Sequence, residues 1–512
     1  MEIELKLLAD ESDLVKLEDL PLVEAVSVGK PSIEHQLNVY FDTPDLQLHR
    51  AGMGLRVRHV DNRRVQTLKA ANRVTGGLHQ REEWETEIDG DRPDLMALRE
   101  LVGKQSPYAE LIAAPQLADR LQPVFTTKSQ RTVRQLRLRT GEEVEMAIDR
   151  GAIEHERGSE AISEIELELK SGTAAHLYAF ALELFEAVPM RIGIQSKAQR
   201  GYASLRPEDK RIVKAEKLQL HPSMTVEDAF EAVVANCMQQ VQGNTEGVTY
   251  GTDPESVHQM RVGLRRLRSA LDLFREAIEC PSVLQEEWRW LGTQLGAARD
   301  WEVLADSTLS HIEDKLPSDV DVAKLKEAAL AQAKRNRDTA AQAVNSPRHT
   351  RLQLQFAEWM TAKGWRSSLP DASASDVDLP LKKYAKQVLK HGEARLLKRG
   401  KRLRDNEPES RHRVRIAGKK ARYATEFFGS LYPKGKVKDY VSSLSDLQEE
   451  LGWLNDAAVA IGLLGQLQAG DPHVASSAAF ARGYLYACVY NDHAHLMQLW
   501  SRFADVDPPY KH

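Results

Sequence analysis

In the first 205 residues, polar and apolar positions mainly alternate with a period of two, which is typical of β-strands. Eight segments carry this alternation: Glu2–Leu8, Leu37–Asp42, Leu55–Val60, Arg64–Ala70, Arg81–Ile88, Thr132–Arg139, Val144–Arg150 and Ile162–Lys170. The short connections between them favour antiparallel pairing. Two further stretches, Pro93–Val102 and Ala174–Ala187, have helical spacing. The pattern predicts eight antiparallel strands with flanking helices.

From residue 222 onward, apolar residues recur at three- and four-residue steps, as they do on the buried face of helices. Clear examples are Ser256–Glu276, Arg411–Phe428 and Tyr440–Leu467. Residues 206–221 are polar and lack an apolar period, so we interpret them as a linker. The chain is therefore predicted to be α+β, with a strand domain at 1–205, a linker at 206–221 and an all-α domain at 222–505.

The helical half contains an internal repeat. The first copy has a histidine and basic residues at offsets 0, 3, 7, 8 and 10: His258, Arg261, Arg265, Arg266 and Arg268. The second copy has His412, Arg415, Lys419, Lys420 and Arg422 at the same offsets. Downstream, Leu295–Asp300 is echoed by Leu451–Asp456. Two copies of one four-helix unit explain this repetition most economically.

Length and composition add limits on compartment and class. With 512 residues, the chain is too long for one core, and the formal charge of −5 conceals local excesses of both signs. The cysteines Cys237, Cys280 and Cys488 match no zinc or redox spacing, which fits a reducing compartment. Neither a signal peptide nor a run of about 18 apolar residues is recognisable. We therefore expect a cytoplasmic protein that does not cross a membrane.

Several predicted strands are charged on one face and aliphatic on the other. Glu2, Glu4 and Lys6 share one face of the first strand, for example, while Ile3 and Leu5 share the other. For any single strand, a solvent-facing side would explain the charges. However, opposite charges recur across many strands, and the predicted helices need an apolar surface to pack on. A closed barrel with its aliphatic side chains outward and its charges inward meets both conditions, and eight strands leave room for a small ligand.

Such an interior would suit a polyanion bound together with metal ions. Clustered carboxylates favour Mg²⁺ or Mn²⁺ through oxygen ligands, and arginines and lysines on neighbouring strands favour phosphate oxygens. This combination is typical of phosphoryl transfer to water. Nucleotide motifs give no support, because there is no phosphate-binding P-loop and Ala51–Arg56 lacks the third glycine of a dinucleotide fingerprint. No Ser-His-Asp or Cys-His arrangement is recognisable either.

Residues 1–205 resemble a CYTH domain, the triphosphate tunnel metalloenzyme fold. The opening Glu2-x-Glu4-x-Lys6 is similar to the signature of that family, and six further motifs follow it in the family order. These motifs are Tyr40–Pro44, Gly54–Arg58, Thr67–Lys69, Glu145–Asp149, Glu164–Glu168 and Ser196–Tyr202. The segment Gly76–Arg81 also resembles the bacterial inorganic triphosphatase branch of the family.

The resemblance implies a role for each matching residue. Metal ligands would be Glu2, Glu4, Glu164, Glu166 and Glu168. Residues that grip the triphosphate would be Lys6, Arg56, Arg58, Lys69, Arg81, Arg131 and Lys197. Catalytic roles would fall to Lys6 and Lys69, with Glu83 and Glu145 near the metals or water. The expected nucleophile is water, activated by a second metal or by a tunnel carboxylate. Two choices stay open: Arg134, Arg137 and Arg139 compete with Arg131, and Glu82 competes with Glu83.

The repeated basic residues form one stripe per copy, because offsets 0, 3, 7 and 10 lie within about a third of a helix circumference. Residues 381–422, which include the second stripe, hold sixteen Lys and Arg against four Asp and Glu. A solvated helix face could explain such charges, and each histidine could be a capping or packing residue. Recurrence at identical offsets instead favours a groove for an extended polyanion. Nucleic acid is disfavoured, because Tyr423 is the only aromatic among these positions.

Residues 222–505 resemble a CHAD domain, a conserved-histidine α-helical domain associated with inorganic polyphosphate. The resemblance implies polyphosphate binding by the two stripes, with Arg266 and Lys420 included. Asn455 stands in the second copy where the first has Arg299, so the copies need not bind equally.

Together, these observations predict a metal-dependent hydrolase that cleaves tripolyphosphate to pyrophosphate and phosphate. The helical domain would hold long polyphosphate chains or localise the enzyme to polyphosphate granules. Three alternatives remain: a class IV-like adenylate cyclase, a thiamine triphosphatase, and a non-catalytic polyphosphate-binding scaffold. No base-binding feature is visible for the first two, and the intact acidic positions disfavour the third.

Overall fold

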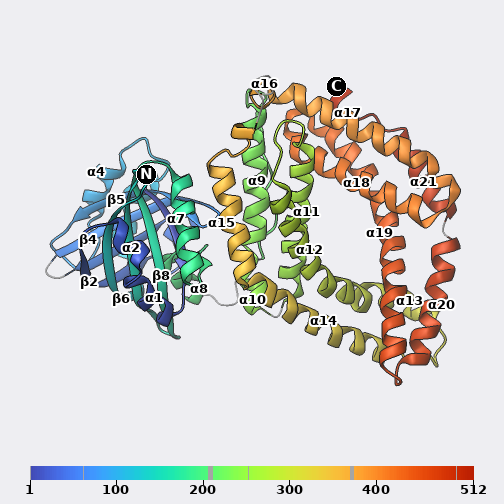
Figure 1. The fold of residues 1–512 in the computed structure, drawn as a ribbon, viewed down its shortest axis with the longest axis horizontal. Coiled ribbons are helices and arrows are strands. Elements are labelled where there is room, and N and C mark those ends of the chain that lie inside the picture. Colours follow the sequence, from blue (N-terminus) through green and yellow to red (C-terminus); the bar gives the residue numbers. More distant parts are fainter. Residues whose placement is uncertain are drawn as a thin grey trace. The chain divides into compact units, whose positions relative to one another are not determined.

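The fold is described from a computed structural model that covers residues 2–60, 63–205, 212–251, 253–368, 374–491 and 493–511. The chain forms two compact units (Figure 1). The first unit comprises Met1–Arg211 and Asn345–Gly364, and the second comprises Ile212–Val344 and Trp365–His512. Among the described residues, no helix is long and apolar enough to cross a membrane.

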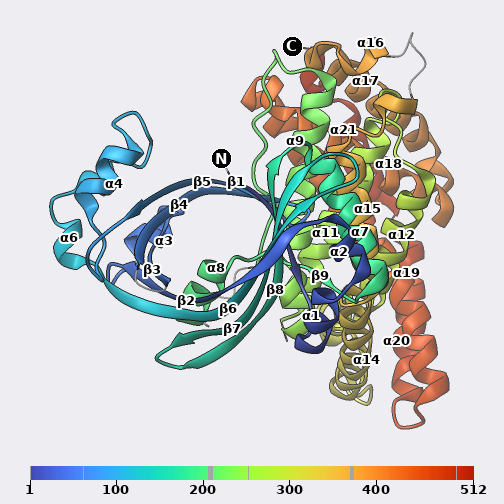
Figure 2. The same ribbon diagram turned by 60° about the vertical axis from the view of Figure 1, so that its left-hand side comes forward.

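The first unit is built on a closed antiparallel β-barrel. Its strands are β1 (Glu2–Leu8), β2 (Ser27–Asp42), β3 (Gly54–Val60), β4 (Arg63–Thr75), β5 (Leu78–Glu87), β6 (Gln122–Arg137), β7 (Glu143–His155) and β8 (Gly158–Ser171). They follow the order β5-β4-β3-β2-β6-β7-β8-β1, and pairing of β5 with β1 closes the ring (Figure 2). A two-residue strand, β9 (Arg191–Ile192), pairs with the end of β1. The predicted eight-stranded antiparallel barrel is thus confirmed.

The aliphatic faces of the strands point outward and lie under helices. Leu5 and Leu7 of β1 are fully buried in a core with Leu14, Val23 and Leu177. The helices of this core are α1 (Glu11–Glu18), α2 (Pro21–Val26) and α7 (Ala174–Ala187). On another part of the barrel, outward side chains of β3 and β4 pack with α4 (Leu95–Val102), α5 (Ala109–Ala113) and α6 (Leu117–Arg120). The charged faces are left to the interior, as the alternation predicts.

The second unit repeats one helical arrangement twice. The first copy contains α9 (Val226–Gln242), α11 (Pro254–Leu273), α12 (Ser282–Glu302) and α14 (Val322–Val344). The second copy contains α17 (Leu381–Gly400), α18 (Pro408–Phe428), α19 (Lys434–Gly470) and α20 (Ala475–Asn491). In the first copy α9 packs on α11 and α12 packs on α14, and in the second α17 packs on α18 and α19 packs on α20. Contacts of α11 with α18 and of α12 with α19 join the copies, which confirms two repeated four-helix units.

Helix α15 (Pro347–Thr361) packs in the first unit, although it lies far along the chain from the barrel. Its Leu354 and Ala357 are buried in the core around α7, and Arg351 pairs with Glu186 at 2.9 Å. Periodicity did not indicate this placement. Residues 212–221 contain neither helix nor strand, and 206–211 lie outside the described residues. The boundaries at 205 and 222 stay predictions.

Candidate active site and candidate polyanion groove

The barrel encloses a cavity of about 670 Å³. Nearly all of the residues predicted to face the tunnel line it: Glu2, Glu4, Lys6, Arg56, Arg58, Lys69, Arg81, Glu83, Arg131, Glu145, Glu166, Glu168 and Lys197. Glu164 is not among the lining residues and is fully buried. The cavity lining therefore brings together, from seven strands and one helix, acidic and basic residues that lie far apart in the sequence.

Strand register places opposite charges next to each other across the cavity wall. On one side of β1, Lys6 lies opposite Glu166 of β8, and on the other side Glu2 lies opposite Arg81 of β5. On the neighbouring pair of strands, Lys69 lies opposite Glu83. Inward side chains on directly paired positions are close enough for ion pairing. The wall is consequently a mixed network of charges with no segregated patches.

Lys6 and Lys69 each contact more than one carboxylate. The Nζ atom of Lys6, which is 1% exposed, donates to Glu164 Oε1 at 2.7 Å and to Glu166, and lies 3.4 Å from Glu4 Oε1. The Nζ atom of Lys69 donates to Glu2 Oε2 at 2.9 Å and lies 3.2 Å from Glu83. Both lysines are thus oriented by acidic neighbours on β1 and adjoining strands.

Pairing keeps these buried groups ionised. Burial and the neighbouring Glu166 act to raise the pKa of Glu4, but Lys6, Arg81 and Lys69 outweigh them and bring it to about 2. Burial acts to lower the pKa of Lys6, but the adjacent Glu164 and Glu166 hold it above its ordinary value. At neutral pH the cavity therefore presents full charges of both signs, which are tolerated in a protein interior when paired.

Several inward donors have no hydrogen-bond partner. The Nε atoms of Arg56 and Arg81 and the Oγ1 atom of Thr67 are buried without a partner among the described residues. A buried donor without a partner costs about 1–3 kcal/mol, so such groups usually have a ligand or water to bind. Because arginine donors match phosphate oxygens, the cavity fits a phosphate-containing ligand.

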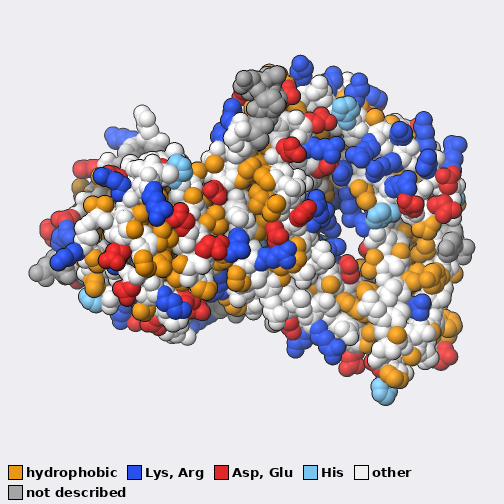
Figure 3. All heavy atoms as spheres, viewed as in Figure 1, with side chains coloured by type: hydrophobic (Ala, Val, Ile, Leu, Met, Phe, Trp, Pro, Cys, Tyr) orange, Lys and Arg blue, Asp and Glu red, His pale blue; other side chains and the backbone are white. Residues whose placement is uncertain are grey.

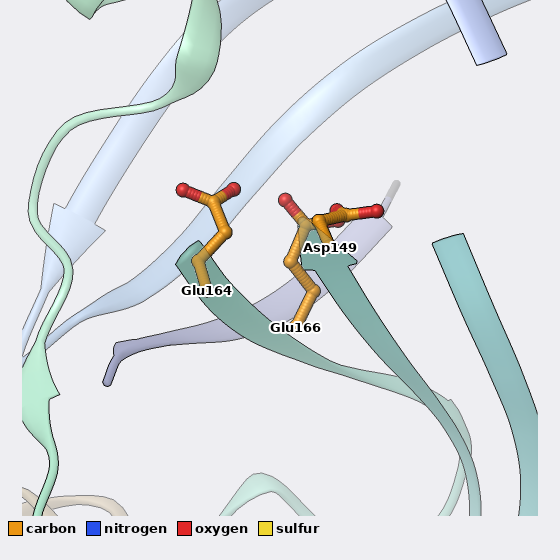
Figure 4. A group of neighbouring side chains, drawn as sticks. All are labelled: Asp149, Glu164 and Glu166. Carbon is orange, nitrogen blue, oxygen red and sulfur yellow. The ribbon is translucent and has the colours of Figure 1, made fainter. Parts of the chain in front are cut away.

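A group of three carboxylates in the barrel could hold a metal ion. Oxygen atoms of Asp149, Glu164 and Glu166 lie within 4.8 Å of one another, and Figure 4 shows the side chains approaching from neighbouring strands. All-oxygen donors suit hard divalent cations. Asp149 and Glu164 are fully buried, however, and neither lines the cavity. The lining carboxylates Glu2, Glu4, Glu166 and Glu168 fit a metal ion in contact with a ligand better.

Asp149 lies in the Glu145–Asp149 motif and belongs to the site, although it was not among the predicted site residues. It accepts hydrogen bonds from Arg131 Nε at 2.8 Å, Arg131 Nη2 at 2.6 Å and Lys197 Nζ at 2.7 Å. Lys197 begins α8 (Lys197–Leu205), which carries it to the acidic cluster. The period-two alternation, which puts Asp149 on the same face of its strand as Glu145, was the signal that could have identified it.

The structure also distinguishes the competing residues. Arg134 donates to the backbone oxygen of Glu18, and Arg137 pairs with Glu143, so neither takes the place of Arg131. Arg139 and Glu82 are exposed, and neither lines the cavity.

In the second unit, α11 and α18 bring the two basic stripes together. We call the cluster formed by Arg261, Arg265, Arg415 and Lys419 the basic groove. Burial, together with the neighbouring Arg415 and Arg265, lowers the pKa of Lys419 to about 7. The Nε atoms of Arg265 and Arg415 are buried without a hydrogen-bond partner among the described residues. In Figure 3, Lys and Arg side chains gather over α17 and α18 and beside the hollow within this unit.

The remaining predicted residues of the stripes are placed differently. Arg266 is 5% exposed, donates to Asn236 Oδ1 at 2.7 Å and lies over the ring of Phe427. Its counterpart Lys420 pairs with Asp272 at 2.5 Å. The ends of the stripes carry His258, His412, Arg268 and Arg422, of which His412 and Arg268 are exposed. Because Arg266 is held in the core, it is less available to a ligand than Arg261 or Arg415.

Known protein families match both the barrel region and the helical region of the chain. The family described as CYTH domain matches residues 1–202, and the family described as CHAD domain matches residues 232–465. The chain contains a CYTH domain followed by a CHAD domain. The cavity therefore lies in the CYTH domain and the basic groove in the CHAD domain.

Two relatives extend this comparison. An inorganic triphosphatase from Haemophilus influenzae is 35% identical over 175 residues, which are 33% of this chain and 47% of that relative. The chain thus matches about half of the length of this curated relative. A crystal structure of the CHAD domain from the plant Ricinus communis is 39% identical, with a TM-score of 0.53, and covers 58% of this chain and 98% of that chain.

Proposed function

We propose that the CYTH domain is a metal-dependent inorganic triphosphatase that hydrolyses tripolyphosphate to pyrophosphate and phosphate. The observation that carries this proposal is the cavity of the barrel, in which carboxylates lie among arginines with unpartnered donor atoms. A small polyanion needs both kinds of group: basic side chains bind it directly, and carboxylates hold the cations that neutralise it. The related inorganic triphosphatase supports the same reaction.

In this proposal the acidic and the basic residues have separate roles. Glu2, Glu4, Glu166 and Glu168 hold Mg²⁺ or Mn²⁺, which when bound supplies charge neutralisation and lowers the pKa of a bound water. Glu164 was included in this set by family resemblance, but its contacts with Lys6 and Lys197 suit a residue that orients these lysines. Phosphate oxygens would contact Lys6, Arg56, Arg58, Lys69, Arg81, Arg131 and Lys197.

Water is the proposed nucleophile, and two lining carboxylates are candidates to accept its proton. Burial acts to raise the pKa of Glu83, but Lys69 and Arg56 hold it below its ordinary value. Glu83 is therefore ionised at neutral pH and able to accept a hydrogen bond from water. Glu145 lies near Lys170, at 3.9 Å, and remains the second candidate.

The test is a parallel assay of the purified protein with Mg²⁺ or Mn²⁺. Tripolyphosphate, ATP, thiamine triphosphate and long-chain polyphosphate are offered separately, and phosphate and cyclic AMP are measured. We expect fastest phosphate release from tripolyphosphate, loss of release with a chelator, and recovery when the metal is restored. Cyclic AMP would indicate a cyclase, faster thiamine triphosphate cleavage a thiamine triphosphatase, and no turnover of any substrate a polyphosphate scaffold.

We further propose that the CHAD domain binds long-chain polyphosphate in the basic groove. Its partly buried, closely spaced cations are unfavourable in the free protein and would be stabilised by a dense polyanion. Arg261→Ala with Arg415→Ala is expected to weaken polyphosphate binding while leaving tripolyphosphate turnover largely unchanged. An equal loss of turnover would refute this division of roles. A cytoplasmic location and an association with polyphosphate granules are part of the same proposal.

A further inference from the structure

Helix α12 leaves room at Gly296 for one cation of the basic groove. This glycine is buried, and the Arg261 guanidinium of α11 lies directly against it. A Cβ atom added at Gly296 would come within 2.5 Å of Arg261 Nη1. Heavy atoms that are not bonded to each other normally stay about 3.5 Å apart or more. The guanidinium therefore occupies space that the side chain of any other residue at position 296 would need.

One turn further along α12, Asp300 contacts the same guanidinium. Residues four positions apart lie on the same face of a helix, and Asp300 Oδ1 is 3.7 Å from Arg261 Nη2. This distance is too long for a hydrogen bond, so the ion pair orients the guanidinium without using its N–H donors. The Arg261 side chain is 27% exposed. It is therefore placed against α12 and still accessible to a ligand.

The second copy of the repeat has no such arrangement. Gly452 of α19 is the counterpart of Gly296, and a Cβ atom added there would meet no atom within 4 Å. The basic counterpart of Arg261, which is Arg415 of α18, thus does not lie against its glycine. Glycine in the interior of a helix is less favourable than alanine. Only in the first copy does a contact with a groove cation compensate for it.

We propose that Gly296 is a positioning residue, which holds open the space in which the Arg261 guanidinium is oriented for binding a phosphate chain. This inference rests on the proposed polyphosphate binding by the CHAD domain. A guanidinium that is oriented before binding loses less conformational freedom when it contacts phosphate oxygens. A side chain at position 296 would push Arg261 away from Asp300 and remove this advantage.

The test compares the full-length wild-type protein with Gly296→Ala and with the matched control Gly452→Ala. Both substitutions add one methyl group at the same position of the repeat, but only the first methyl group meets Arg261. We expect Gly296→Ala to weaken binding of long-chain polyphosphate about three- to tenfold, whereas Gly452→Ala should bind as the wild type does. Alanine favours a helix, and the displaced atoms are the end of a flexible side chain. Neither variant should therefore unfold at a lower temperature than the wild type.

A double-mutant cycle with Arg261→Ala shows whether Gly296 acts through Arg261. In the Arg261→Ala background, Gly296→Ala should change the polyphosphate affinity by less than about twofold. An equal loss of affinity with and without Arg261 would overturn the inference. So would a Gly296→Ala variant with wild-type affinity, or one that unfolds at a lower temperature, and polyphosphate binding itself would still stand. If the wild-type protein does not bind polyphosphate, the proposed function fails, and this inference fails with it.

Discussion

Asp149 affects the cavity through other residues, because it does not line the cavity but holds two cations that do. Its carboxylate binds the Arg131 guanidinium through two hydrogen bonds and the Lys197 ammonium through a third. Burial acts to raise its pKa, but Arg131 and Lys197 keep it below the ordinary value. Planar two-point pairing fixes the orientation of a guanidinium as well as its position. Asp149 is thus a positioning residue for both phosphate-binding cations.

Asp149→Asn is therefore expected to lower kcat/KM for tripolyphosphate by about ten- to a hundredfold, the usual effect of losing a charge-assisted hydrogen bond. The physical reason is that an amide can neither neutralise the two cations nor accept the same three hydrogen bonds. Steady-state kinetics measures kcat and KM separately. We expect most of the fall in kcat/KM to come from a higher KM. Glu154→Gln, on the same strand but paired with exposed Lys128, is the control. Unchanged kinetics in a folded Asp149→Asn variant would contradict the assignment.

The period-two alternation of the strands predicted most of the residues that face the cavity. It did not predict which of the inward residues are fully buried and which line the cavity. Glu164 and Glu166 share one face of β8, yet only Glu166 lines the cavity. Lys6 and Lys197 contact both carboxylates, but Glu164 also pairs with Arg200 of α8 and is fully buried. Likewise, Arg131 is distinguished from Arg134 by its partners, because Arg131 pairs with Asp149 and Glu166 whereas Arg134 donates to the backbone of Glu18. Such facts depend on neighbouring elements and are not contained in the pattern of one strand.

Among the elements, α8 links packing to the site because its first residue is Lys197. Its Gly201 lies against the Phe125 ring, and an added Cβ atom would come within 2.2 Å of that ring. The neighbouring Tyr202 contacts the same ring, with centroids 5.2 Å apart. Glycine is required at this position because the backbone of α8 lies so close to the Phe125 ring. The position of α8 against the barrel therefore depends on Gly201.

Gly201→Ala is expected to lower the free energy of unfolding by about 1–3 kcal/mol, as overpacking generally does. Because α8 must move to accommodate the methyl group, Lys197 should also be displaced and tripolyphosphate turnover should fall. Thermal unfolding and initial rates measure the two effects. Ala203→Ser, at an exposed position of α8, is the control. A variant that loses stability but keeps full turnover would show that Lys197 does not depend on this packing.

Element types followed from periodicity more readily than element partners did. Long amphipathic helices such as α11 and α18 were predicted, but α1 and α2 were not, because six to eight residues give a weak period. The apolar residues of α15 predict a buried face without saying what covers it. Only the structure shows that Leu354 and Ala357 are buried in the core of the barrel unit that contains α7. Partner choice is a property of tertiary packing.

Across the whole molecule, the net charge of −5 does not reveal that the two sites differ in their balance of acidic and basic residues. In the CYTH cavity, acidic and basic residues are paired almost one to one. In the CHAD groove, cations outnumber their carboxylate neighbours and are partly buried. A bound polyanion would relieve the repulsion among these cations. Burial, together with the neighbouring Arg415 and Arg265, lowers the pKa of Lys419 to about 7.

Polyphosphate binding should consequently weaken as pH rises through neutrality. Lys419 is charged below its pKa of about 7 and neutral above it, and a bound polyanion favours the charged form. Binding near pH 8 should therefore take up a proton, and affinity should fall between about pH 6.5 and about pH 8.5. Burial and Arg299 hold the pKa of His258 below its ordinary value, so this histidine stays neutral over that window.

Calorimetry in buffers of different ionisation enthalpy measures the proton uptake directly. Lys419→Arg keeps the charge at every pH, so the polyphosphate affinity of this variant should vary little with pH. Lys419→Met removes the charge, so its affinity should be lower at low pH and should also vary little with pH. A slope that persists in both variants would show that another group controls binding.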